Sequence, residues 1–173
     1  MHAFRSHTCA ELTEANVGQP VRLSGWVNRK RDHGRLVFVD LRDHYGLTQC
    51  VVDSSDPTFA AVEATRLESV VTITGTVLKR SDETINTSLP TGHIEVRIEQ
   101  FEVQSAADTL PLQVNSDVDS GEETRLRYRY LDLRRSRPHD NIMLRAKIIQ
   151  SIRTRMVAPV SYTHLRAHET DRY

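Results

Sequence analysis

Three short segments in the first third of the chain alternate apolar with polar residues, and only a few polar residues separate one segment from the next. The segments are VRLSGWVN from Val21, LVFVDLR from Leu36 and LTQCVVD from Leu47. A period of two is typical of a strand with one buried face, and such short connections pair neighbouring strands antiparallel. The pattern therefore predicts a three-stranded meander.

The residues after the meander add one helix and two more strands. Asp56 and Pro57 provide a cap and a proline suited to a first helical turn, opening a helix that extends to Leu67. Alternation returns at 70–78 and 93–103, on either side of the polar stretch KRSDETINTSLPT. This order predicts a mainly β fold, a five-stranded OB-fold barrel with Greek-key topology and one helix.

The last third of the chain differs in composition from the barrel. Residues 105–123 are poor in large apolar side chains and rich in Asp, Ser and Pro, which is typical of a linker. Further on, apolar residues recur every three or four positions, which predicts an amphipathic helix with a basic flank. These residues are Ile142, Ala146, Ile149, Ile152 and Met156. We expect a barrel domain at 1–104, a linker or hinge at 105–139 and a helical segment at 140–157.

The composition excludes several classes of function. Lys and Arg, 23 in all, balance 23 Asp and Glu, so any nucleic-acid site must come from local clustering of charge. The cysteines and histidines lack metal-ligand spacing, and no segment has the roughly 20 apolar residues that span a bilayer. The sequence also contains no glycine-rich phosphate loop and no nucleophile motif. We expect a cytoplasmic protein, with no metal, cofactor or catalytic site in this chain.

Phe38 lies on the polar side of the second predicted strand, where an aromatic ring can stack on an unpaired base. Arg29, Lys30 and Arg31 precede that strand and add cations that can hold phosphates or read base edges. The alternatives are a core aromatic at the rim of a small barrel and an ordinary solvated run of charge. The aromatic and the cations together favour single-stranded nucleic acid.

Two more polar residues fall on the same predicted face. Gln49 on the third strand offers both a donor and an acceptor, and Glu95 on the last strand can accept from a base amino group. Taken singly, each residue also fits an ordinary surface position. The spacing of these residues predicts an oligonucleotide-binding module and nothing more specific.

Four segments, taken in order, resemble aspartyl-tRNA synthetases of the bacterial type. They are HTCAEL, SGWVNRKRDHGRLVFVDLRDHYGLTQCV, TGHIEV and LRYRYLDLRR. In that family the barrel binds the tRNA anticodon, so the resemblance implies that Phe38 stacks under the central anticodon base. The positions that match base readers or lie near the anticodon are Arg31, Gln49, Glu95, Arg80 and Asn86.

The resemblance also implies a homodimeric class II ligase that joins aspartate to tRNA(Asp) with ATP and Mg²⁺. Residues 140–157 would begin its catalytic domain, and the second and third class II motifs are absent, so we expect this chain alone to be inactive. His33 stands where relatives that charge only tRNA(Asp) tend to carry leucine, which implies that tRNA(Asn) is charged too. Residues 158–173 resemble translated sequencing-adapter DNA, and we expect a non-native tail there.

Two other interpretations compete with this one. A stand-alone OB-fold protein that binds single-stranded DNA or RNA fits the barrel, but the segment RYLDLRR argues against it. Asparaginyl- and lysyl-tRNA synthetases share the architecture, but RKRDHGRLVFVDLRD together with RYLDLRR fits the aspartyl pattern better. Selective binding of one tRNA would separate these interpretations.

Overall fold

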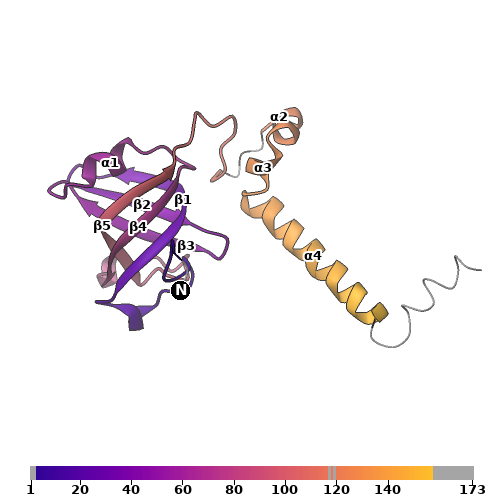
Figure 1. Cartoon of the computed structure of the whole chain (residues 1–173), viewed down its shortest axis with the longest axis horizontal. Helices are drawn as coiled ribbons and strands as arrows, with labels where there is room; N and C mark the ends of the chain where they lie inside the picture. Colours follow the sequence, from indigo (N-terminus) through magenta and orange to yellow (C-terminus); the bar gives the residue numbers. More distant parts are fainter. Residues whose placement is uncertain (1–2, 117, 119, 158–173) are drawn as a thin grey trace, which may run out of the picture. The chain divides into compact units, whose positions relative to one another are not determined.

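The structure is a computed structural model that describes residues 3–116, 118 and 120–157 (Figure 1). The chain divides into two compact units, Met1–Leu110 and Pro111–Tyr173. The first unit contains the strands and the second contains the C-terminal helices.

Five strands form a closed barrel in the first unit. In chain order they are β1 (Pro20–Asp32), β2 (Leu36–Arg42), β3 (Leu47–Asp53), β4 (Val70–Lys79) and β5 (Ile94–Ser105). Around the barrel the order is β1-β2-β3-β5-β4, and β4 closes it by pairing with β1. β3 and β5 pair in parallel, whereas the other neighbours pair antiparallel. The predicted five-stranded barrel is confirmed.

The core of the barrel consists of inward-facing aliphatic side chains. Buried and partly exposed residues alternate from Val21 to Asn28 on β1, as the period of two predicts. Leu23, Leu41 and Ile73 are fully buried in this core. Burying a side chain of this size contributes about 1.5–3 kcal/mol, so the inward face stabilises the barrel. The outward-facing residues are left for other contacts.

β1 is longer than predicted and continues through Arg29, Lys30 and Arg31, which we expected to precede the second strand. Arg31 pairs with Phe38 of β2, because the β1–β2 hairpin keeps its ladder almost to the turn. The chain then reverses at Gly34, whose φ of +78° lies in the left-handed region that favours glycine. The extension places Arg31 on a rigid strand.

α1 (Phe59–Ala64) is shorter than the predicted helix. Oδ2 of Asp56 accepts from the backbone N of Asp53 at 3.3 Å, so the residues before Phe59 form a turn instead of a helical cap. At the other end, Lys30 Nζ donates to two carbonyl oxygens, one of them that of Thr65 at 2.8 Å. A cation in this place satisfies free carbonyls and complements the helix dipole.

The second unit begins with α2 (Glu122–Arg127) and α3 (Arg129–Asp132), two short helices within the range predicted as a linker. The side chain of Asp132 is fully buried. Three guanidinium groups surround its carboxylate: Arg125 Nε at 3.2 Å, Arg129 Nη1 at 2.7 Å and Arg135 Nη1 at 3.5 Å. The segment RYLDLRR thus folds around one buried carboxylate, and these cationic partners offset the cost of burying it.

α4 (Ser136–Val157) carries the predicted apolar stripe but begins before residue 140, where the helical segment was expected to begin. Pro138 is compatible with this early start because the first-turn amides of a helix have no partner within it. Ile142 is 42% exposed and Ile152 is 51% exposed, so the apolar stripe is exposed to solvent in the described part of the chain. Residues 158–173, predicted as a non-native tail, lie outside the described residues.

Candidate nucleic-acid interface

Four of the predicted site residues gather on the outer face of the barrel. Arg31 at the end of β1 pairs with Phe38 of β2, and Gln49 of β3 pairs with Asp40 of β2. The parallel pairing of β3 with β5 brings Gln49 beside Glu95. We call Arg31, Phe38, Asp40, Gln49 and Glu95 the polar patch.

Arg31 connects two strands of this patch through a single nitrogen. Its Nη2 donates to Asp40 Oδ1 at 2.8 Å and to Gln49 Oε1 at 3.1 Å. The Asp40 contact is also an ion pair, and its carboxylate is largely shielded from water, with 11% of the side chain exposed. Charge-assisted bonds of this kind are shorter and stronger than neutral ones. The guanidinium is therefore held in one place on the face.

Gln49 continues the network toward β5. Its Nε2 donates to Glu95 Oε2 at 3.2 Å, while its Oε1 accepts from Arg31. The opposite amide orientation would set an NH₂ group against the guanidinium of Arg31 and an oxygen against the carboxylate of Glu95. Both contacts would be repulsive, so the amide has one favourable orientation.

Phe38 is half-buried and lines a surface hollow of about 580 Å³. Val51, Leu78 and Arg97 are among the other residues that line it. His33, predicted from the resemblance, packs edge-on against Phe38, with the ring centroids 5.5 Å apart and the ring planes at 84°. The lining also includes the carboxylates of Asp53, Asp56 and Glu95. The aromatic ring and the nearby cation suit an unpaired base with its phosphate.

Arg80 lies just after β4 and is only 5% exposed. Its Nε is 3.8 Å from Glu95 Oε2, and its Nη1 donates to the carbonyl oxygen of Thr84 at 3.3 Å. Nε and Nη2 are buried with no hydrogen-bond partner among the described residues. Burial lowers the pKa of Arg80, and the attraction of Glu95 opposes that shift. The predicted residue Arg80 thus adjoins the polar patch with unused donors.

The remaining predicted residues are outside the hydrogen-bonded network of the described residues. Arg29 is exposed on β1, opposite Asp40. Oδ1 of Asn86 accepts from the backbone N and the hydroxyl of Ser88, at 3.1 and 2.6 Å, so its side chain shapes a turn. Lys30 is bound to the end of α1. The expectation of three cations beside Phe38 is therefore corrected for Lys30, which has a structural role.

Asp40 is the site residue that sequence reasoning does not single out. It has the same outward parity on β2 as Phe38, and it lies directly opposite Gln49. The signal that could have revealed it is register, because a short hairpin turn fixes which residues face each other across two strands. Counting outward from the turn at Tyr45 pairs Asp40 with Gln49.

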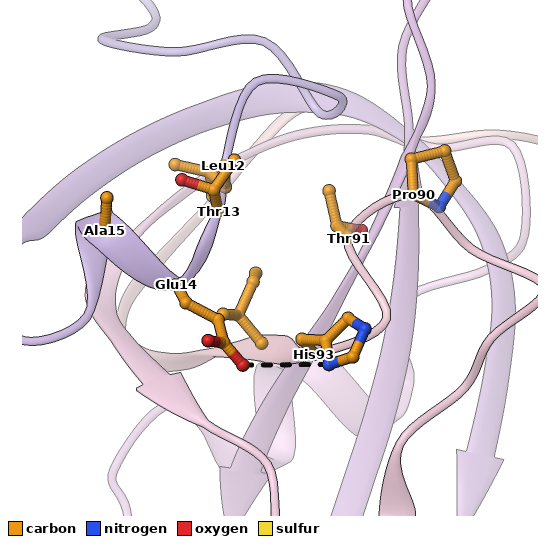
Figure 2. A pocket seen from close by; sticks show the side chains of 8 residues that line it. Leu12, Thr13, Glu14, Ala15, Pro90, Thr91 and His93 are labelled. Atoms are coloured by element: carbon orange, nitrogen blue, oxygen red, sulfur yellow. Dashed lines mark ion pairs between the residues drawn. The ribbon is translucent and has the colours of Figure 1, made fainter.

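A second hollow, of about 430 Å³, lies beside η1 (Glu14–Asn16) and the residues that precede β5 (Figure 2). Oε1 of Glu14 forms ion pairs with His93 Nδ1 at 3.7 Å and with Lys79 Nζ at 3.6 Å. None of the predicted site residues lines this hollow. These contacts tie η1 to the β4 and β5 side of the barrel.

Among residues 3–116, 118 and 120–157, no group of three or more His, Cys, Asp or Glu side chains could hold a metal ion. No helix within the same ranges has the length and apolar character to span a bilayer.

Two family models match the sequence. Residues 21–104 match the family described as OB-fold nucleic acid binding domain, and residues 121–163 match tRNA synthetases class II (D, K and N). Curated relatives named Aspartate--tRNA(Asp/Asn) ligase include those of Paramagnetospirillum magneticum, 59% identical over 157 residues, and Zymomonas mobilis, 58% identical over 157 residues. The matches cover 91% of this chain but only 18% and 26% of those proteins.

Solved structures agree with the fold. Asparaginyl-tRNA synthetase from Pyrococcus horikoshii, complexed with asparaginyl-adenylate, matches with a TM-score of 0.73 and 26% identity, over 87% of this chain and 34% of that one. The matches to both family models and to the curated relatives agree with the resemblance of the sequence motifs. The chain belongs to the aspartyl-tRNA synthetase family, of which it carries the OB-fold anticodon-binding domain and part of the class II synthetase domain.

Proposed function

We propose that the polar patch binds the anticodon of a tRNA and that this chain is the anticodon-binding part of an aspartate–tRNA ligase. The observation that carries the proposal is the hydrogen-bonded chain from Arg31 through Gln49 to Glu95, on the same face as Phe38. Recognition of unpaired RNA bases requires an aromatic ring for stacking, with fixed donors and acceptors beside it. The polar patch offers both.

Each residue of the patch has a role in this proposal. Phe38 stacks on a base, which contributes roughly 1–3 kcal/mol. Arg31 uses Nη2 within the protein, so Nη1 is left to donate to a base edge. Glu95 uses Oε2 for its contacts with Gln49 and Arg80, which leaves Oε1 to accept from a base amino group.

We further propose that the longer protein charges both tRNA(Asp) and tRNA(Asn) with aspartate. Relatives at 58–59% identity carry the name Aspartate--tRNA(Asp/Asn) ligase, which supports this specificity. The reaction would use ATP and Mg²⁺, as class II synthetases do, in a cytoplasmic homodimer. We expect this chain alone to bind tRNA without charging it, and aspartate-dependent ATP–pyrophosphate exchange by the purified chain would contradict that expectation.

The proposed binding is tested with the whole chain and labelled RNA stem-loops, by fluorescence anisotropy at one fixed salt concentration. One stem-loop carries the aspartate anticodon, and three others each replace one anticodon base. We expect the aspartate stem-loop to bind at least several-fold more tightly than the weakest of the others, since a lost base contact costs roughly 1–3 kcal/mol. Equal binding of all four and of oligo(U) would instead indicate a non-selective single-strand binder.

A pair of glutamine variants provides the matched control. Gln49 is in the patch, whereas Gln100 is exposed elsewhere on β5. Gln49→Ala should reduce binding of the aspartate stem-loop about tenfold, since a base contact and its alignment are lost. Gln100→Ala should leave binding within about twofold of the original. Equal effects of the two variants would remove Gln49 from the site.

A further inference from the structure

Asp40 has an unusual position for an acidic residue on a surface proposed to bind a polyanion. It is 8% exposed and faces outward on β2, between Arg31 and Gln49. A carboxylate there repels phosphate, so by its charge alone Asp40 would weaken the binding of every RNA. Asp40 can therefore favour RNA binding only indirectly, through the residues that it contacts.

The contacts of Asp40 indicate what that contribution is. Its carboxylate binds the same nitrogen of Arg31, Nη2, that donates to Gln49 Oε1. Arg31 is otherwise weakly held, because its Nε is buried without a hydrogen-bond partner among the described residues. The ion pair with Asp40 is thus the shorter and stronger of the two contacts that hold the guanidinium.

The position of Arg31 in turn determines the orientation of the Gln49 amide. Gln49 accepts from Arg31 on one side and donates to Glu95 on the other. If Arg31 moves away, only the Glu95 contact remains, within the part of the chain that the structure describes, to orient the amide, and a side chain held at one end can rotate. The order of dependence is Asp40, then Arg31, then Gln49.

We propose that Asp40 is a positioning residue of the anticodon site, which sets the base selectivity of Gln49 by holding Arg31. This inference rests on the proposed function, because the selectivity that it explains is that of anticodon binding. Asp40 contributes by orienting Arg31 and Gln49 before the RNA binds. The binding free energy is then not reduced by the cost of ordering these two side chains. Asp40 does not contact the RNA.

The test compares selectivity, defined as the ratio of the dissociation constants of a base-substituted and the aspartate stem-loop. The anticodon position that Gln49 reads is the one at which Gln49→Ala lowers this ratio most. Asp40→Asn keeps the shape but removes the charge, and we expect it to lower the ratio at that position about fivefold. Asp40→Ala should lower it about tenfold or more. In the Gln49→Ala background, Asp40→Asn should lower it no further.

The matched control is Glu99→Gln, which removes the same charge from an exposed carboxylate bonded to Thr76 on the barrel surface. This variant should slightly lower the dissociation constants of all stem-loops and leave their ratio unchanged. If Asp40→Asn behaves in the same way, Asp40 acts only through its charge and the inference is overturned. Loss of the folded barrel in both Asp40 variants, measured by circular dichroism, would also overturn it. An original chain that shows no selectivity contradicts the proposed function itself, which distinguishes the two failures.

Discussion

The ring of His33 packs edge-on against the ring of Phe38, with the two centroids 5.5 Å apart and the ring planes at 84°. His33 lies in the β1–β2 turn, and Phe38 is the proposed stacking surface for an anticodon base. A side chain in that turn can therefore alter the shape of the base site without reading a base itself. Discrimination between the aspartate and asparagine anticodons, which differ in one base, is sensitive to such a change.

His33→Leu should narrow the specificity of the site. We expect the original chain to bind stem-loops with the aspartate and asparagine anticodons within about fivefold of each other, and the variant to prefer the aspartate stem-loop by about tenfold. The physical reason is that leucine replaces a planar edge contact on Phe38 with a bulkier branched one. The two dissociation constants, measured side by side, check this. A strong aspartate preference already present with His33, and unchanged by leucine, would remove His33 from specificity.

Lys30→Met should destabilise the barrel without weakening RNA binding. Lys30 donates to two carbonyl oxygens at the end of α1, and losing a charged hydrogen bond at a helix terminus costs about 1 kcal/mol. Urea unfolding of the whole chain measures the change. The control is Arg29→Met, the exposed neighbour, which should leave stability within about 0.5 kcal/mol. Stem-loop affinity that falls more with Lys30→Met than with Arg29→Met would contradict the structural role.

Asp132→Asn should loosen the second unit. The buried carboxylate balances Arg125, Arg129 and Arg135, and removing its charge leaves these guanidinium groups to repel one another. Since two of the arginines are partly exposed, we expect the free energy of unfolding of this unit to fall by about 2 kcal/mol, which is less than for a fully buried pair. Faster trypsin cleavage within α2 would report it. Asp140→Asn, at an exposed carboxylate on α4, is the control and should leave the cleavage rate unchanged.

The two thiols, Cys9 and Cys50, should be unreactive in the folded chain. Burial raises the pKa of both well above the ordinary 9.0, and the nearby carboxylates Asp43 and Asp40 add to the shift. The unfolded chain therefore loses these protons first as the pH rises. The corresponding stability is complete below pH 9.0 and declines above it. Ellman's reagent at pH 8 should label neither thiol until urea is added, and rapid labelling of the native chain would contradict this.

The strands were predictable because one buried face imposes a period of two on the sequence. The outward parity of Phe38 and Gln49 follows from the same alternation, and the structure agrees. The contact between Gln49 and Glu95 was beyond such reasoning, since it depends on the parallel pairing of β3 and β5 in the closed barrel. Pairings between distant segments are set by tertiary packing and leave no local pattern.

Two local features were also missed for physical reasons. Lys30 looked like part of a basic surface, but its partner is the end of α1, a helix that lies in a later part of the sequence. α2 and α3 are too short for periodicity to reveal, and the contacts around Asp132 hold them in place. In both cases a charged residue has a structural partner that only the fold brings near.

The central claim, that Phe38 is a stacking surface for an anticodon base, is tested most directly by replacing Phe38 with alanine and with leucine. Tyr45, an aromatic that is 57% exposed in the β2–β3 turn, provides the matched control as Tyr45→Ala. We predict that Phe38→Ala weakens binding of the aspartate stem-loop by roughly 1–3 kcal/mol, that leucine restores little of the loss, and that Tyr45→Ala changes nothing measurable. Unchanged affinity in a Phe38→Ala chain with an intact circular dichroism spectrum would contradict the account.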